Sequence, residues 1–515
     1  MAPKSRTEYS VINMFTGMIG YLVNTIVGFV CRIVFVRTLS AEYLGVSGLF
    51  TNILSVLSLA ELGISSAIVY ALYKPIAEND EDKITAIMQF YKKAYEIIGI
   101  VVAIAGLITM PFLHLIIRNP PAIHENLYVL YLLYLLNTVS SYFFSYRASL
   151  LTAMQRQYIV SGYNYVITIA QSALQIIFLL LTHQYITYLL IQIIGGFVYN
   201  IWVSHKATKD YPYILRKNVQ PLSKVEKHSI FINIKALAIN KISGVLVNST
   251  DNIAITYFTG LSSVGYASNY SLLSSMVGSL IGLVFNALPG SVGNLNATAS
   301  KEKSYQFFNV LNLMDFWLFG WGGIGIAVVS TDLVKWFYGE QYALPFYIPL
   351  ILAVNLYTIG MLQACYTYKS TLGLFRYGQY LLFFTGIINL VLDIVMGKIW
   401  GMFGIYLATL IARACTNLWY EPYAVYKYGL NKNPLIFWKR YCWYAFILLI
   451  AGSLSYFVCS FYHFHIAVNA ILKFITCCII PNIVFILFLH KTQEFAYLKE
   501  KLSSVINGIF RRMSK

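Results

Sequence analysis

Several charged side chains stand inside long apolar stretches of this 515-residue sequence, and they are the first candidates for chemistry. Lys241, Glu61 and Arg413 fall near the centres of their stretches, whereas Arg32 and Asp251 fall toward one end. If the stretches cross a membrane, an unpaired charge at mid-bilayer costs roughly 3 kcal/mol on insertion scales. Such charges need water or partners, and a water-filled cavity that binds a charged molecule meets this need.

Polar residues recur at spacings of three and four around these charges, which places them on one face of a helix. The stretch that carries Arg32 has Asn24 on this face, and the stretch that carries Lys241 has Asn248 and Asn252. We expect these side chains to line the cavity. Glycine and serine on the same faces have a simpler explanation, because small residues let membrane helices pack closely.

The charges also allow explanations without a ligand. Asp251 could neutralise a neighbouring Lys or Arg and only hold helices together. Arg32 and Asp393 could reach the outer headgroups, because long or terminal side chains extend toward the interface. Glu61 and Asp251 are candidates either for binding a coupling ion or for ion pairing.

The elements that position these residues are membrane helices. Of all residues 58% are hydrophobic and 11% are charged, against about a quarter charged in soluble domains. Apolar stretches long enough to cross the roughly 30 Å hydrocarbon core recur along the chain. We predict an all-α, polytopic membrane protein of about fourteen transmembrane helices, with spans near 11–36, 45–72, 94–117, 126–147, 157–181, 185–204, 229–257, 265–292, 305–334, 343–368, 378–397, 402–426, 441–461 and 466–489.

The distribution of positive charge predicts the orientation. With Arg147, at the very end of its span, counted in the following loop, the two tails and the even-numbered loops carry 28 Lys and Arg, and the odd-numbered loops carry four: Arg37, Arg118, Lys335 and Lys398. This asymmetry places both termini in the cytoplasm. The net charge of +17 is then explained by topology and by attraction to lipid. We expect no nucleic-acid partner.

Recognisable catalytic and metal motifs are missing from the sequence. It contains no GxxxxGK[ST] phosphate loop, and none of its seven cysteines forms a CxxC or Cys/His ligand spacing. We therefore expect no catalytic residues, no metal site and no cofactor, and predict that the protein is not an enzyme.

The chain divides at a basic loop near 205–228 into similar halves. Leu39-Ser40 and Gly45 match Leu261-Ser262 and Gly265 at a shift of about 220 residues. A six-span repeat returns the chain to the same side, so both halves share one orientation. We predict two six-helix bundles around a central cavity, in residues 1–215 and 216–430, and a third region, 431–515, with two more helices and a basic tail.

This organisation resembles the multidrug/oligosaccharidyl-lipid/polysaccharide (MOP) exporter superfamily, and local patterns resemble its polysaccharide-transport family of Wzx-type oligosaccharide flippases. The patterns are Phe35-Val36-Arg37-Thr38-Leu39-Ser40 with Glu42-Tyr43-Leu44-Gly45, and Asp251-Asn252-Ile253 with Gly260, Val264-Gly265-Tyr266 and Tyr270. The resemblance covers nearly the whole chain, and its motifs are short.

The resemblance implies a flippase of a bacterial plasma membrane that moves polyprenyl-diphosphate-linked oligosaccharide repeat units to the outer leaflet by alternating access. A diphosphate with sugars cannot cross hydrocarbon without replacement of its hydration. Arg32, Lys241 and Arg413 would bind the diphosphate, and the three asparagines would bind sugar. Membrane lipid, a polysaccharide polymerase and other assembly proteins are the candidate partners.

Other functions stay open. A peptidoglycan-precursor flippase would use the same cationic cavity. A cation-coupled multidrug antiporter would use carboxylates such as Glu61, Asp251 and Asp315, although Arg32 and Lys241 argue against it. A sugar polymerase or ligase usually has a large external loop, which this sequence lacks, and a scaffold would gain nothing from charges inside its spans.

Overall fold

The computed structural model describes residues 6–501, except 62–63, 118–120, 218, 229, 232–233, 235–243, 245–248, 287, 375 and 379. Within this part of the chain every regular element is helical, which confirms the predicted fold class. The chain forms two compact units, residues 1–265 and 266–515, and each is described by itself. The predicted boundaries at 215 and 430 stay predictions.

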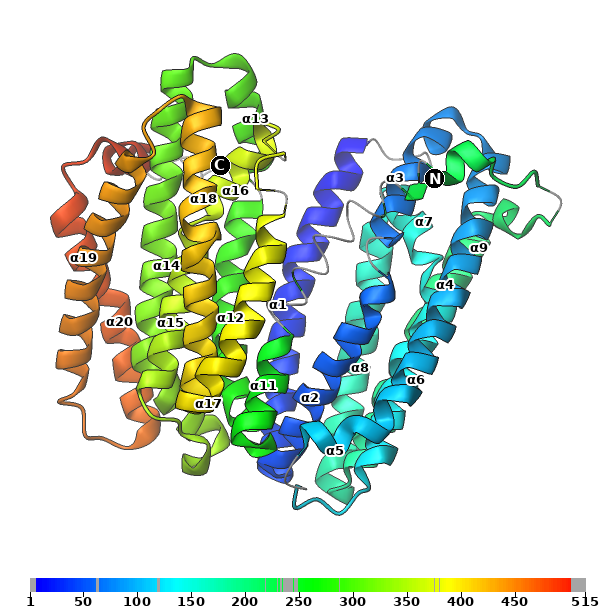
Figure 1. The fold of residues 1–515 in the computed structure, drawn as a ribbon, viewed down its shortest axis with the longest axis horizontal. Coiled ribbons are helices and arrows are strands. Elements are labelled where there is room, and N and C mark those ends of the chain that lie inside the picture. Colours follow the sequence, from blue (N-terminus) through cyan, green and yellow to red (C-terminus); the bar gives the residue numbers. More distant parts are fainter. Residues whose placement is uncertain are drawn as a thin grey trace, which may run out of the picture. The chain divides into compact units, whose positions relative to one another are not determined.

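The first unit is a set of long helices with short ones at their ends (Figure 1). α1 packs on α8, α8 on α9, and α6 packs on both α9 and α4, while α11 lies against α2. Its elements are α1 (Arg6–Thr38), α2 (Ala41–Leu57), η1 (Ser58–Glu61), α3 (Ile64–Glu78), α4 (Glu81–Thr109), η2 (Met110–Phe112), α5 (Leu113–Ile116), α6 (Leu127–Ser145), α7 (Ala148–Ala153), α8 (Gln157–Thr182), α9 (Tyr185–Asp210), η3 (Pro212–Leu215), α11 (Thr250–Thr259) and the start of α12 (Leu261–Asn286).

The second unit is built around α14, which packs on α15, α19 and α20, while α19 and α20 run side by side (Figure 1). Most of α14 is buried, so it forms the core of this unit. The remaining elements are α13 (Pro289–Thr298), α14 (Lys301–Tyr338), η4 (Glu340–Tyr342), α15 (Tyr347–Gly360), α16 (Gln363–Thr371), α17 (Leu381–Cys415), α18 (Asn417–Ala424), the π-helical turn η5 (Val425–Leu430), α19 (Leu435–Cys459) and α20 (Ile466–Leu489).

α17 is a helical hairpin. Gly401 has φ 57° and ψ −136°, a conformation that glycine adopts without the steric penalty of a Cβ atom. The Oγ1 atoms of Thr385 and Thr416 lie 2.7 Å apart, and Asn389 Nδ2 donates to Thr409 Oγ1 at 3.2 Å. Residues on opposite sides of Gly401 therefore meet in antiparallel order, as the separately predicted spans 378–397 and 402–426 require.

Eleven of the described helical segments are long and apolar enough to cross a membrane, so the protein is an integral membrane protein. This set counts the α17 hairpin together with α18 and η5 as one segment. It leaves out predicted span 45–72, because α2 ends at Leu57 and η1 follows. Most of predicted span 229–257 lies outside the described residues. The count of fourteen stays a prediction.

Candidate functional site

Two of the predicted cavity residues, Lys241 and Asn248, lie outside the described residues. The others are distributed over both units, with Asn24, Arg32, Glu61, Asp251 and Asn252 in the first and Arg413 in the second. Their roles in binding stay predictions.

The polar face of α1 is partly a packing face. A Cβ atom on Gly20 would lie 1.7 Å from the ring of Tyr165 in α8, so only glycine allows this contact. Farther along the helix, Arg32 is half-buried, and the amide oxygen of Asn24 is buried with no hydrogen-bond partner among the described residues. A buried acceptor of this kind is costly unless something satisfies it. Asn24 therefore has the open hydrogen-bonding capacity that a ligand could use.

Glu61 is the last residue of η1 and accepts a hydrogen bond from a tyrosine hydroxyl group. Tyr95 Oη donates to its carboxylate at 2.6 Å, and the neighbouring Tyr91 ring stacks edge-on against Tyr95 with centroids 4.5 Å apart. Among the described residues, no Lys, Arg or His nitrogen is within ion-pair distance of Glu61. Glu61 is half-buried, and its partner is neutral. Its carboxylate therefore has no counter-ion among the described residues and remains partly accessible.

The starts of α2 and α12 meet in a reciprocal contact within the first unit. A Cβ atom on Gly45 would lie 2.1 Å from the Leu261 carbonyl oxygen, and one on Gly265 would lie 2.2 Å from the Ala41 carbonyl oxygen. Each residue of one pair is the counterpart of a residue of the other pair at the shift of about 220. Two segments that are equivalent at this shift therefore bury the same surface against each other, while the repeat of the two halves stays a prediction.

Polar residues extend the contact between α2 and α12. Ser262 Oγ donates to Glu42 Oε1 at 3.1 Å. Asn252, in α11, lies beside Gly48, where a Cβ atom would be 3.6 Å from its Nδ2 atom. Asp251 is in the first turn of α11, where the helix dipole favours a negative charge. The motif residues that carry the sequence resemblance are thus brought together in space.

Arg413 is half-buried near the C-terminal end of α17. Its Nη1 atom donates to Asn355 Oδ1 of α15 at 3.4 Å. The Asn355 amide nitrogen in turn donates to the carbonyl oxygens of Ile351 and Tyr406, at 3.1 and 3.0 Å. This arrangement fixes the amide and directs its oxygen at the guanidinium group, so that Arg413 is held in place.

Asp315, one of the carboxylates considered for an antiporter, has a structural contact. It is fully buried in α14, and its Oδ2 atom accepts a hydrogen bond from Ala364 N at 2.9 Å. Ala364 lies in the first turn of α16, where backbone N–H groups lack intrahelical partners. Asp315 therefore caps the helix that follows the break after α15.

A buried oxygen-rich cluster lies inside the α17 hairpin. Asn389 Nδ2 donates to Asp393 Oδ1 at 3.1 Å and to Thr409 Oγ1, and all three side chains are buried. The Asn389 amide oxygen is buried with no partner among the described residues. Carboxylate, amide, hydroxyl and carbonyl oxygens are the donors that hard cations prefer. The cluster could hold such a cation or a proton. The Asp393 side chain is buried in this cluster.

Two further charge pairs were missed by the sequence analysis. Lys369 Nζ lies 2.7 Å from Glu421 Oε1, and Lys473 Nζ lies 2.5 Å from Asp332 Oδ2. The second pair could have been found from the opposite charges at similar depth in two predicted spans. Groups of three or more His, Cys, Asp and Glu suited to a metal ion do not occur in the part of the chain that the structure describes.

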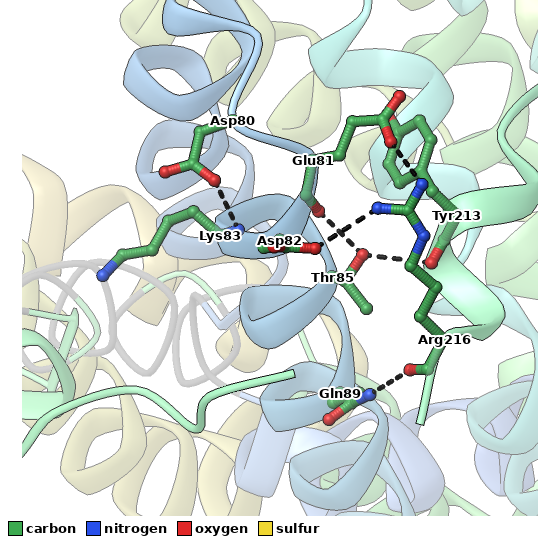
Figure 2. Close-up of polar contacts among 8 residues, drawn as sticks. All are labelled: Asp80, Glu81, Asp82, Lys83, Thr85, Gln89, Tyr213 and Arg216. Atoms are coloured by element: carbon green, nitrogen blue, oxygen red, sulfur yellow. Dashed lines mark hydrogen bonds and ion pairs between the residues drawn. The ribbon is translucent and has the colours of Figure 1, made fainter. Parts of the chain in front are cut away.

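The basic loop after α9 is docked on the N-terminus of α4 (Figure 2). Arg216 lies 2.7 Å from Glu81 and 3.3 Å from Asp82, and its carbonyl oxygen accepts from Gln89 at 2.7 Å. Thr85 donates to the Tyr213 carbonyl oxygen, and burial raises the pKa of Tyr213 to about 12. This loop is therefore an ordered part of the first unit, held by charge and by backbone contacts.

The helices of this chain are arranged in the same fold as several solved membrane proteins. The chain is similar to the lipid II flippase MurJ in an inward closed conformation, with TM-score 0.62, 15% identity, and coverage of 92% of this chain and 98% of that one.

Two other solved structures share the fold. One is an inward-facing multidrug resistance MATE family transporter, with TM-score 0.54, 13% identity, and coverage of 76% of this chain and 91% of that one. The other is a MOP superfamily transporter from Pyrococcus furiosus, with TM-score 0.52, 13% identity, and coverage of 82% and 96%. No protein-family model and no curated protein sequence matches the chain.

Proposed function

We propose that this protein is a flippase of the bacterial plasma membrane, with both termini in the cytoplasm, that moves polyprenyl-diphosphate-linked oligosaccharide repeat units to the outer leaflet for surface polysaccharide synthesis. The main support for a transporter is the fold, because the similarity to the lipid II flippase MurJ covers 92% of the chain. The sequence patterns between α1 and α2 and between α11 and α12 supply the choice of an oligosaccharide cargo.

The described charges support a polar pathway for an anionic cargo. Arg32 and Arg413 are half-buried in long apolar helices, and Asn24 offers an amide oxygen without a partner among the described residues. Cationic and amide groups of this kind replace the water that a diphosphate and its sugars lose. We infer that Arg32, Lys241 and Arg413 bind the diphosphate, and that Asn24, Asn248 and Asn252 bind sugar.

The test is leaflet exposure of a polyprenyl-diphosphate oligosaccharide in proteoliposomes. We expect the unaltered protein to move the lipid and Arg413→Ala and Lys241→Ala to slow it at least tenfold, which corresponds to ~1.4 kcal/mol. Arg376→Ala removes an exposed loop arginine and serves as the matched control. All variants are first compared by size-exclusion chromatography in detergent. Equal rates for Arg413→Ala and Arg376→Ala would overturn the role of Arg413.

The same vesicles separate the alternatives. A peptidoglycan-precursor flippase would move lipid II faster than the oligosaccharide lipid. A cation-coupled antiporter, the second candidate, is favoured by the buried Asn389–Asp393–Thr409 cluster and by Glu61, which has a neutral partner. That function requires an ion gradient to drive export of a cationic dye while the oligosaccharide lipid stays in place.

A further inference from the structure

A pocket of about 420 Å³ lies in the first unit, and none of the residues discussed so far except Arg147 lines it. It is formed where α4, the end of α6 and the last turns of α9 meet. Its lining combines three basic residues, two hydroxyl groups and four apolar or aromatic side chains: Lys92, Phe143, Phe144, Tyr146, Arg147, Ile201, Ser204, His205 and Thr208.

The basic residues of the pocket come from three different elements. Lys92 belongs to α4, Arg147 follows α6, and His205 belongs to α9. Because the chain brings them to one pocket, the positive charges of Lys92 and Arg147 add at one place, and the His205 imidazole lies beside them. The predicted orientation puts this end of the three helices on the cytoplasmic side, where anionic lipid concentrates positive juxtamembrane groups.

Arg147 is held in a defined position by neutral groups. Its Nη1 atom donates to Ser204 Oγ at 2.6 Å and to Thr208 Oγ1 at 3.1 Å, and its Nε atom donates to Tyr146 Oη at 3.0 Å. Among the described residues, no carboxylate lies within ion-pair distance of its guanidinium group. Its charge is therefore oriented by the fold and not neutralised by it.

Lys92 is only weakly neutralised. Its Nζ atom is 3.7 Å from Glu96 one turn along α4, and both side chains are about half exposed. Exposed pairs of this kind contribute little. Lys92 can therefore turn from Glu96 toward an anion in the pocket.

Apolar side chains continue from the pocket toward the membrane interior. Phe143 lies one turn before Arg147, and Leu136 is farther along the same helix; both are exposed. On α9, Ile201 lies one turn before His205, and Ile194 lies farther from His205 along the same helix. Both side chains are exposed. A phosphate at the basic residues would thus have acyl chains beside two apolar helix faces. A free anion, which has no acyl chains, would make no apolar contact with these helix faces.

We propose that this pocket binds the headgroup phosphate of an anionic phospholipid of the cytoplasmic leaflet, with Arg147 as the central ligand and Lys92 and His205 at its sides. Arginine offers two parallel N–H donors to a phosphate, and lysine supplies a point charge. The site does not depend on the cargo of the transporter. It makes anionic lipid a bound component of the protein.

The test uses the purified full-length chain in detergent and native mass spectrometry of bound lipid. Phosphatidylglycerol and phosphatidylcholine with identical acyl chains are the two probes. We expect tighter binding of phosphatidylglycerol, and roughly fivefold weaker binding in Lys92→Gln, the loss expected for one basic residue near anionic lipid. Lys93→Gln, the next exposed lysine of α4, does not line the pocket and should leave binding unchanged.

Arg147→Gln should weaken the binding of phosphatidylglycerol more than Lys92→Gln does, and Arg147→Lys should restore part of the lost binding. If Arg147→Gln does not fold, the comparison of Lys92→Gln with Lys93→Gln still tests whether the pocket binds the lipid. Equal binding of the two lipids, or an equal loss in the two lysine variants, would overturn the site. Displacement of phosphatidylglycerol by millimolar inorganic phosphate would overturn the lipid assignment in favour of a free anion.

Discussion

Two glutamates, one in each unit, are held in opposite ways. In the second unit, both carboxylate oxygens of Glu421 contact Lys369 Nζ, at 2.7 and 2.8 Å, and the pair is nearly buried. In the first unit, Glu61 is half-buried and accepts a hydrogen bond from the neutral phenol of Tyr95. Lys369 is a counter-ion for Glu421 and the pair stabilises its surroundings, whereas the described partner of Glu61 is a neutral phenol, which leaves the carboxylate open to a cation.

The difference shows that a charge inside an apolar sequence is not by itself a functional residue. Lys473 and Asp332 form a second pair like that of Glu421, and Asp315 caps a helix. Each of these charges has a protein group that accounts for it. The charges to test for transport are those whose partners are neutral, of which Glu61 is the clearest described carboxylate.

The largest expected effect on stability is that of Lys369→Ala. It leaves the Glu421 carboxylate buried without a counter-ion, and breaking a buried pair costs about 3–5 kcal/mol. The measurement is thermal unfolding of the detergent-solubilised protein. Lys369→Met combined with Glu421→Leu removes both charges and should recover most of the loss. If Lys369→Ala is as stable as the unaltered chain, the pair does not stabilise the second unit.

Tyr95→Phe should have an intermediate effect. It removes the hydrogen bond to the Glu61 carboxylate, and hydrogen bonds to charged groups contribute about 1.5–3 kcal/mol. The matched control is Tyr91→Phe, because Tyr91 is equally buried and its hydroxyl group meets the neutral Ser149. Thermal unfolding should show a smaller loss for Tyr91→Phe. A larger loss for Tyr91→Phe than for Tyr95→Phe would contradict a charged Glu61.

The smallest effect on stability is expected for Glu61→Gln, because the amide oxygen still accepts from Tyr95; the change should be within about 1 kcal/mol. If the Glu61 carboxylate binds a cation during transport, the transport rate should nevertheless fall roughly tenfold or more. A tenfold change corresponds to ~1.4 kcal/mol. The measurement pairs lipid movement in proteoliposomes with thermal unfolding. Full transport by Glu61→Gln would place Glu61 with the structural charges.

Much of the fold followed from residue types and spacing. Apolar length and charge counts predicted membrane helices, including two spans on either side of residues 398–401. The structure has a glycine with positive φ, Gly401, at this break. The local match of Gly45 with Gly265 also singled out two residues that the structure brings into one reciprocal contact. The spacing of three and four also put Asn24 and Arg32 on one face of α1.

The sequence by itself determined which helices could enter a membrane and which charges they carry. Only the tertiary structure decided what each charge meets: a phenol for Glu61, a helix N-terminus for Asp315, and an ammonium group for Glu421. The physical reason is distance along the chain. Helical periodicity fixes the face on which a side chain lies, but the partner comes from another helix, and packing alone selects that helix.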